Sequence, residues 1–270
     1  MPHPFVAKPI GQPFIELQSV DSTNNYALGR VHAGLAQDGM AVFAHRQVAG
    51  KGQWGRVWTT GESSDIILSV LLKPDPLQLS QQFQLSACSA VAVHHFFMNY
   101  AGEDTRIKWP NDLYWQDRKA GGILIESVVG SRAVTNTGSL TGSYRGTGSH
   151  WQWAVIGIGI NINQTRFPVE LLNPVSLKQI TGKTFDAVFL AKELCSCLEK
   201  YFSQLISEGF EPVFNQYLSH LYKRDEKVKL KKSNRIFEAT IKTISPSGQL
   251  VVQHGSMEEV FNFGEVEWII

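Results

Sequence analysis

The chain lacks the features that would mark a secreted, membrane-spanning or nucleic-acid-binding protein. Its 270 residues include 3 cysteines, and 25 basic residues nearly balance 24 acidic ones for a formal net charge of +1. Three cysteines cannot all pair within one chain, so reduced thiols are favoured. A balanced charge gives no basic surplus for binding nucleic acid.

Other absences concern targeting and metal binding. The N-terminal Met1-Pro2-His3-Pro4 has no basic region followed by an apolar core, and no apolar run is long enough to span a bilayer. Cys195 and Cys197 lie two positions apart in a helical pattern, where their side chains point apart, so a metal site there is not expected. We expect a cytoplasmic protein that binds neither membranes nor nucleic acid.

Hydrophobic periodicity predicts two regions of different structure. Up to residue 223, short strand patterns alternate with long amphipathic helical ones; past Arg224, short alternating runs are separated by turns at 233–234 and 246–248, which is typical of a small β-barrel. We therefore expect domains at 1–223 and 224–270. The predicted strands include 14–17, 40–44, 66–72 and one starting at 151, and the predicted helices include one from 22–23 towards Gly34, 80–100, 186–206 and 211–222.

The most informative stretch is residues 107–112 (IKWPND), followed by 117–124 (DRKAGGIL). Proline disfavours a helical conformation in the preceding residue and Asn-Asp favours a turn, so these residues predict strand, turn, strand. Lys108, Asp112 and Lys119 would then converge near strand ends. Charges that merely solvate hairpin tips are the alternative. The glycine pair beside Lys119 argues against it, because strand glycines often mark close approach of a ligand.

A second stretch, residues 47–58 (QVAGKGQWGRVW), is rich in glycine and follows a predicted strand. Its free backbone N–H groups, with Lys51 and Arg56, are suited to wrap a phosphate or a carboxylate. A mobile surface loop is the alternative. The segment is not a dinucleotide fingerprint, because no third glycine and no helix follow.

Taken in order, five blocks of this chain resemble the biotin protein ligase family, that is, biotin–[acetyl-CoA carboxylase] ligases. The blocks are residues 21–24 (DSTN), Gln47 with the glycine-rich segment, 108–112 (KWPND), Lys119 with 121–124 (GGIL), and 156–161 (IGIGIN). The resemblance implies an α+β fold, in which a mixed β-sheet packs against helices as in class II synthetases and biotin–lipoate ligases, with a C-terminal SH3-like β-barrel.

The same resemblance implies a two-step reaction. ATP would activate biotin as biotinyl-5′-AMP, and biotin would then pass to a lysine of an apo biotin carboxyl carrier protein domain in acetyl-CoA carboxylase or a related carboxylase. Lys119, Asp112 and Arg56 are the expected catalytic residues. Asp112 would either hold Mg²⁺ with the nucleotide or accept a proton from the incoming amine.

Further roles carry over position by position from the family. The residues expected to bind biotin are Ser22, Thr23, Asn24, Gln47, Lys51, Gly52, Gln53 and Lys119. Those expected to bind ATP or the adenylate are Lys51, Arg56, Trp58, Lys108, Asn111, Lys119 and Asn161. Ser22 and Thr23 also suit an ordinary helix cap, and a tryptophan such as Trp58 also suits a core position.

The chain departs from the family's pattern in three places. Gln53 stands where the family usually has arginine, and the lost charge leads us to expect weaker retention of the adenylate. Residues 130–149, rich in Gly, Ser and Thr, suggest a mobile insertion of unassigned purpose. The catalytic pattern starts by Phe14, so we expect a short form without the N-terminal DNA-binding domain of some relatives.

Other functions and states stay open at this level. Lipoate ligases and octanoyltransferases share the expected fold, although the 108–112 block and the glycine-rich segment favour biotin. A non-catalytic biotin or adenylate sensor is a second alternative, and an interaction protein built on the C-terminal barrel is a third. Monomer and homodimer are both compatible with the sequence, and it does not identify which carboxylase would be modified.

Overall fold

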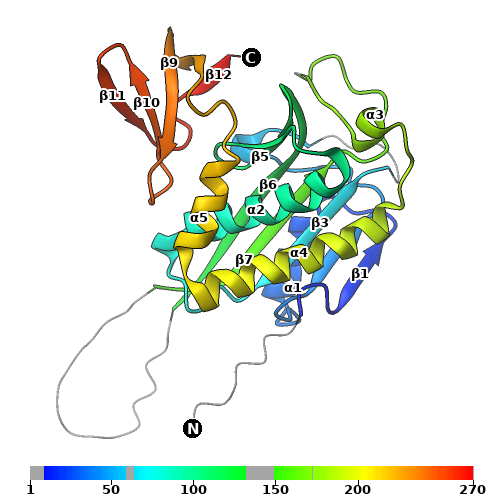
Figure 1. Cartoon of the computed structure of the whole chain (residues 1–270). Coiled ribbons are helices and arrows are strands. Elements are labelled where there is room, and N and C mark those ends of the chain that lie inside the picture. Colours follow the sequence, from blue (N-terminus) through cyan, green and yellow to red (C-terminus); the bar gives the residue numbers. More distant parts are fainter. Residues whose placement is uncertain (1–8, 59–63, 132–148, 172, 270) are drawn as a thin grey trace, which may run out of the picture.

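The computed structural model describes residues 9–58, 64–131, 149–171 and 173–269, which form two β-sheets and the helices around the larger one (Figure 1). The seven-stranded sheet has the order β1-β2-β3-β7-β6-β5-β4, and the five-stranded sheet has the order β11-β10-β9-β8-β12. The strands of the large sheet are β1 (Phe14–Leu17), β2 (Ala41–Ala44), β3 (Ile66–Leu72), β4 (Thr105–Lys108), β5 (Asp112–Trp115), β6 (Arg118–Ser131) and β7 (Ser149–Ile160). Those of the small sheet are β8 (Lys227–Lys232), β9 (Arg235–Ile244), β10 (Leu250–His254), β11 (Met257–Phe261) and β12 (Glu267–Ile269).

The helices are α1 (Thr23–His32), α2 (Gln82–Ala101), α3 (Leu177–Thr181), α4 (Ala187–Glu208) and α5 (Phe210–Ser219), with short 3-10 helices at Gln53–Gly55 and Leu79–Gln81. Local sequence explains where α4 begins and ends. The Asp186 carboxylate accepts hydrogen bonds from two backbone N–H groups of the first turn, and Gly209, with φ at +83°, follows the last residue.

The expected α+β fold is confirmed. In the large sheet β1 and β2 are parallel and the remaining pairs are antiparallel, so the sheet is mixed. The five C-terminal strands are all antiparallel, consistent with an SH3-like domain. The barrel expected there is not closed in the described residues, since β11 and β12 end the strand order without pairing with each other.

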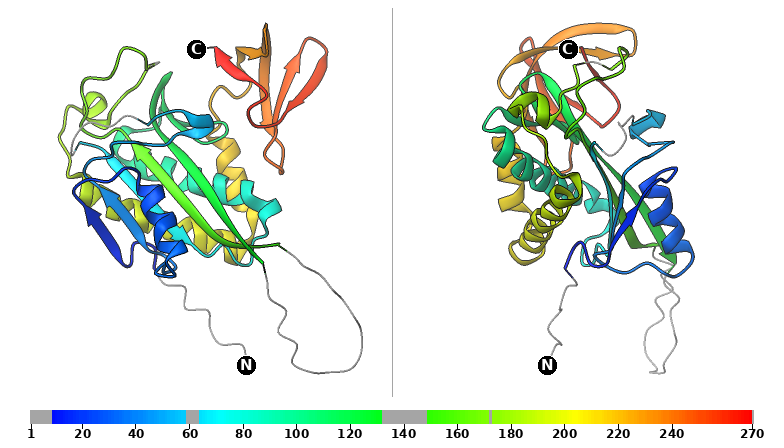
Figure 2. Two further views of the ribbon diagram at one scale, coloured as in Figure 1. Left: turned by 180° about the vertical axis from the view of Figure 1, so that it is seen from behind. Right: turned by 90° about the vertical axis from the view of Figure 1, so that its right-hand side faces the viewer.

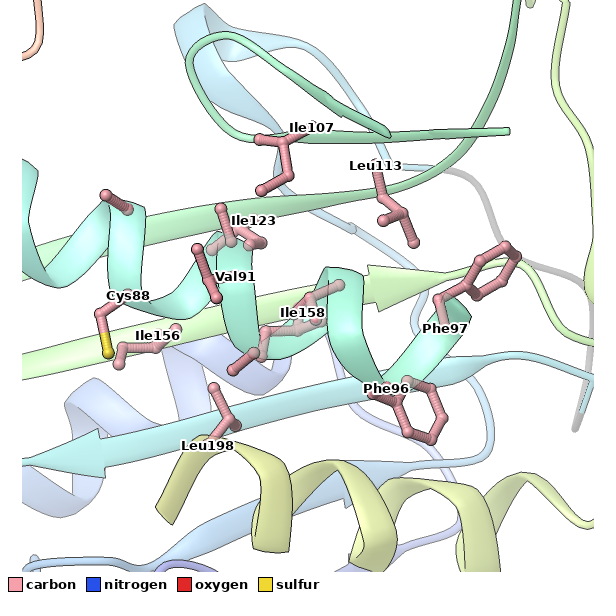
Figure 3. Packing of buried hydrophobic residues seen from close by; sticks show 14 of the residues in the cluster. Cys88, Val91, Phe96, Phe97, Ile107, Leu113, Ile123, Ile156, Ile158 and Leu198 are labelled. Atoms are coloured by element: carbon pink, nitrogen blue, oxygen red, sulfur yellow. The ribbon is translucent and has the colours of Figure 1, made fainter. Parts of the chain in front are cut away.

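Helices cover the two faces of the large sheet unequally. Helices α2, α4 and α5 pack together over one face, and α1 packs against β2, β3 and β7 on the other (Figure 2). Because α2 lies between the sheet and its companion helices, it is buried on almost every side. Its side chains meet those of β4 to β7 and α4 in the main core (Figure 3).

The C-terminal half of strand β7 has one apolar face and one face without side chains. Ile156, Ile158 and Ile160 are buried in the main core, and Gly157 and Gly159 alternate with them. Because successive side chains of a strand point to opposite faces, both glycines open onto the side that α1 only partly covers. This bare surface positions the candidate site.

The two sheets are in direct contact. The Trp109 indole Nε1 donates to the Gly248 carbonyl at 2.9 Å, and its ring lies edge-on to Phe263 at 5.9 Å. Buried residues of both sheets belong to a single hydrophobic cluster. Among the described residues, no helix combines the length and apolarity needed to cross a membrane.

Three local expectations need correction. The predicted helix over 211–222 ends at Ser219, because Leu221 instead pairs beside Ile107 at the edge of the large sheet. Strand β12 was not predicted. Residues 130–131 and 149 of the supposed insertion belong to the β6–β7 ladder, which pairs Ser131 with Ser149; residues 132–148 lie outside the described residues.

Candidate functional site

A charged cluster lies where β4, β5 and β6 adjoin. The β4–β5 turn pairs Lys108 with Asp112, and the next turn brings Lys119 back alongside β5. Lys119 Nζ lies 2.7 Å from Asp112 Oδ1, and the two side chains are 30% and 25% exposed. An added Cβ at Gly122 would lie 3.2 Å from Asp112 Oδ1 and 3.6 Å from Lys119 Nζ. The predicted convergence of these charges beside the glycine pair is confirmed.

Lys108 is a buried cation, and none of the described carboxylates is in hydrogen-bond contact with it. Its Nζ lies 3.2 Å from Tyr114 Oη, 4.7 Å from the centre of the Tyr114 ring and 5.3 Å from that of Trp268. The pKa of Lys108 is lowered to about 8, chiefly by burial and also by the Lys119 and Arg56 cations, while Asp112 opposes this shift. A cation held by aromatic faces next to other cations is suited to receive an anion.

A hydrogen-bonded network joins α1 to β3, to β6 and to Gln47 in the segment that follows β2. Gln47 Oε1 accepts from the Thr23 backbone N–H at 2.9 Å, and Ser69 Oγ lies 2.7 Å from Thr23 Oγ1. Ser69 Oγ also lies 2.6 Å from Asn24 Oδ1. The Nδ2 atom of the same Asn24 amide donates to Glu126 Oε2 at 2.7 Å. Thr23, Ser69 and Asn24 are each 3% exposed or less. The expected biotin-binding residues Thr23, Asn24 and Gln47 thus share one polar network, here called the floor network.

The alternative that Ser22 and Thr23 form an ordinary helix cap is correct in position, but the expected capping hydrogen bond is not made. Ser22 occupies the N-cap position, but its side chain makes no capping hydrogen bond. Gln47, from a distant segment, supplies the acceptor for the first helical N–H instead. The local pattern located the helix start correctly but could not reveal a partner 24 residues away.

The glycine-rich segment folds back on itself. Lys51 bridges to Val57, the Gly52 N–H donates to the Arg56 carbonyl at 2.7 Å, and Gln53 begins the 3-10 turn between them. Lys51 Nζ reaches to 3.6 Å from Glu126 Oε1, which connects the segment to the floor network. Arg56 is exposed, and its guanidinium lies 3.8 Å from Glu267 Oε1 of β12.

Trp58 lies on the bare face of β7. An added Cβ at Gly159 would meet its indole at 2.4 Å, and Lys119 Nζ lies 5.8 Å from its ring centre. Its Nε1 is buried and has no hydrogen-bond partner among the described residues. Trp58 is outside both buried hydrophobic clusters, so the alternative that it is a core residue is wrong. Gly157 gives Asn24 the same kind of room, because an added Cβ would lie 2.4 Å from Asn24 Oδ1.

Two expected nucleotide-binding residues have their amide donors engaged elsewhere. Asn111 Nδ2 donates to the Ile123 carbonyl, and Asn161 Nδ2 donates to the Val175 carbonyl at 3.1 Å. Both side chains are buried. These amides join neighbouring backbone segments that support the charged cluster, and their contact with the nucleotide stays a prediction.

Sequence reasoning missed four residues of this region: Ser69, Tyr114, Glu126 and Trp268. Glu126 had a usable signal, because it is the one acidic residue of β6 and alternates onto the face of Gly122. Ser69 and Trp268 had none, since their partners are remote in the chain. Among the described residues, no group of three or more His, Cys, Asp or Glu is placed to hold a metal ion, and the three cysteines are free.

Comparison with known proteins agrees with this geometry. The family model described as "Biotin/lipoate A/B protein ligase family" matches residues 16–161, and "Biotin protein ligase C terminal domain" matches residues 225–268. The bifunctional ligase/repressor BirA of Bacillus spizizenii is 34% identical over 208 residues, covering 76% of this chain and 58% of the relative. The chain thus matches under two thirds of that relative's length.

Two further comparisons extend over almost the whole chain. A biotin–[acetyl-CoA-carboxylase] ligase of Paracoccus denitrificans is 27% identical over 256 residues, covering 93% of this chain and 98% of the relative. The structure of the Aquifex aeolicus biotin protein ligase in complex with biotin and ATP has a TM-score of 0.74 at 24% identity, covering 94% and 97% of the two chains. The latter shows the shared fold.

Proposed function

The chain belongs to the biotin/lipoate A/B protein ligase family, and from this premise we propose that it is an ATP-dependent biotin protein ligase. It activates biotin as biotinyl-5′-AMP and transfers biotin to a lysine of an apo biotin carboxyl carrier protein domain. The observation that carries this proposal is the pairing of two unlike surfaces. A neutral hydrogen-bonding floor lies beside a cluster of cations, and Glu126 and Lys51 connect the floor to the glycine-rich segment.

In the first step, a biotin carboxylate oxygen attacks the α-phosphorus of ATP and pyrophosphate leaves. Negative charge builds up at phosphorus, so fixed cations lower the barrier, and loss of one such donor typically costs about two to three decades in rate. We assign Lys119 to the carboxylate and the α-phosphate. Lys108 and Arg56 are assigned to the phosphates, and Trp58 to the adenine.

In the second step, a carrier lysine amine attacks the activated carbonyl, an amide forms and AMP leaves. Asp112 is the carboxylate nearest to this centre, 2.7 Å from Lys119 Nζ. It either accepts the proton of the amine or holds Mg²⁺. A single carboxylate fits Mg²⁺, which proteins usually hold through one or two carboxylates together with substrate phosphates. Bound there, Mg²⁺ would neutralise phosphate charge.

The floor network suits the ureido ring of biotin, which offers two N–H donors and one carbonyl acceptor. We assign Ser22, Thr23, Asn24 and Gln47 to this end. Lys51, Gly52 and Gln53 cover the ligand from the glycine-rich segment. We further propose that residues 1–223 are the catalytic domain and 224–270 a separate C-terminal domain, because β1–β7 and β8–β12 form separate sheets. The use of ATP and a carboxylase carrier favours action in the cytoplasm.

The test is biotin-dependent labelling of an apo carrier domain with ATP and Mg²⁺, run beside Lys119→Ala. We expect labelling by the wild type and a loss of at least about a hundredfold in the variant, because a fixed cation is removed from the reacting phosphate. Lys183→Ala removes an exposed lysine outside the site and serves as the matched control.

The other outcomes separate the alternatives. Biotin binding without carrier labelling or ATP–pyrophosphate exchange would identify a sensor rather than an enzyme. Labelling with lipoate or octanoate in place of biotin would retain the fold and overturn the substrate.

A further inference from the structure

Glu126 is the one carboxylate of a long strand and stands in its middle, after the apolar run of residues 123–125. It lies on β6, and its side chain is 29% exposed. By strand alternation it shares a face with Gly122 and Leu124, the face on which the charged cluster lies. A half-buried carboxylate needs partners to compensate for its lost hydration.

The two oxygens of Glu126 have partners on different elements. Oε2 accepts from Asn24 Nδ2 of α1 at 2.7 Å, and Oε1 lies 3.6 Å from Lys51 Nζ of the glycine-rich segment. The first contact is short and charge-assisted, and its Asn24 partner is buried. The second is long, and Lys51 is 41% exposed, so it is the weaker of the two.

The chemistry of these partners fixes the orientation of the Asn24 amide. An ionised carboxylate only accepts hydrogen bonds, so the atom facing Glu126 must be the NH₂ group. The amide oxygen then faces Ser69 Oγ at 2.6 Å, where a hydroxyl can donate. Without Glu126, either orientation of the amide would be open. Gly157 leaves the space that the amide occupies.

We propose that Glu126 is a positioning residue for biotin: it fixes the orientation of the Asn24 amide in the floor network and tethers Lys51 near the same pocket. This inference rests on the proposed function. Glu126 acts through Asn24, whose second N–H and carbonyl lone pair are thereby presented in one arrangement. The weak Lys51 contact is readily exchanged for the carboxylate of an incoming ligand.

Direct measurement of biotin binding without ATP tests the proposal. Glu126→Ala should weaken biotin binding about tenfold, because the Asn24 amide loses its charge-assisted hydrogen bond and with it its fixed orientation. Glu126→Gln should stay within about threefold of the wild type, because its amide oxygen can still accept from Asn24. In an Asn24→Ala background, Glu126→Ala should change the dissociation constant less than twofold, since the group it orients is gone.

Thermal unfolding of each variant separates positioning from folding, and Glu258→Ala, an exposed carboxylate on β11, is the matched control. Glu126→Asp retracts the carboxylate by one methylene; it should weaken binding comparably and replaces Glu126→Ala if that variant does not fold. Wild-type affinity in Glu126→Ala, or effects of Asn24→Ala and Glu126→Ala that simply multiply, would overturn the inference alone. Failure of the wild type to bind biotin would overturn the proposed function with it.

Discussion

At the residue scale, Lys108 illustrates how burial turns an ordinary side chain into a titratable one. Its pKa falls from the usual 10.5 to about 8, first because the ammonium is buried and then because Lys119 and Arg56 are close. Below pH 8 the side chain is charged, and above it the charge is lost. Binding of an anion favours the charged form, so affinity for that anion must decline as pH rises through this range.

We predict that ATP binding in the presence of Mg²⁺ weakens about tenfold between pH 7 and pH 9, because about one Lys108 side chain in ten is still protonated one unit above its pKa. Lys108→Arg should abolish most of this dependence, since arginine keeps its charge throughout. Isothermal titration calorimetry at fixed ionic strength measures both profiles. Parallel profiles for the two proteins would show that another group causes the change.

The residues of the site were predictable where the chain itself brings them together. Lys108, Asp112 and Lys119 follow from two turns within twelve residues, so turn chemistry and a glycine pair were enough. Glu126 and Ser69 meet Asn24 across 102 and 45 positions, respectively, and no local pattern encodes such a contact. The engagement of Asn111 and Asn161 with backbone carbonyls was hidden for the same reason.

At the element scale, β7 shapes the candidate site through two residues that have no side chain. Its isoleucines fill the core, and its two glycines leave space that Asn24 and Trp58 occupy from the other side. The alternating glycines of residues 156–160 are therefore explained by the room that Asn24 and Trp58 need, without a role in phosphate binding. The long strands and helices were predictable from periodicity, whereas β12 has only three residues and too little pattern to detect.

We predict that Gly157→Ala weakens biotin binding at least tenfold, because the new methyl group would lie 2.4 Å from Asn24 Oδ1 and must displace that side chain. Some stability should be lost as well, as overpacking typically costs about 1–3 kcal/mol. Gly29→Ala, at an exposed position of α1, adds the same methyl group where nothing lies within 4 Å, and is the control. Unchanged biotin affinity in Gly157→Ala would mean that Asn24 is not part of the biotin site.

At the scale of the whole molecule, the two sheets meet at the turn that precedes the charged cluster. Trp109 donates to Gly248, an added Cβ at Gly248 would lie 2.6 Å from the Phe83 ring, and the Trp268 ring faces Lys108. Because one hydrophobic cluster spans both sheets, we expect the wild type to unfold in a single transition. The start of a second sheet after residue 224 was foreseeable from the change in periodicity, but the contact between the sheets was not.

We predict that Gly248→Ala lowers the unfolding temperature more than Gly255→Ala. Both glycines have positive φ, +94° and +62°, so both variants carry backbone strain of about 1–2 kcal/mol. At Gly248 alone the added methyl group also collides with Phe83 of α2, the helix that packs on the large sheet. Differential scanning calorimetry should show a larger decrease, or a second transition, for Gly248→Ala. Equal decreases would show that the sheets are not coupled through this contact.

The segment between the two sheets is so short that the C-terminal strands cannot move far from the large sheet. Leu221 is bridged to Ile107 and Arg224 to Ile241, so two residues, Tyr222 and Lys223, separate the last pairing with one sheet from the first pairing with the other. Both are also held by Asp117, at 2.7 Å and 3.0 Å. Two residues extend over about 7 Å at most. The short connection therefore holds the C-terminal strands at a nearly fixed distance from the large sheet. In a chimaera that replaced this segment with a flexible Gly/Ser linker, the effective concentration of Trp268 near Lys108 would fall, although no contacting residue had changed.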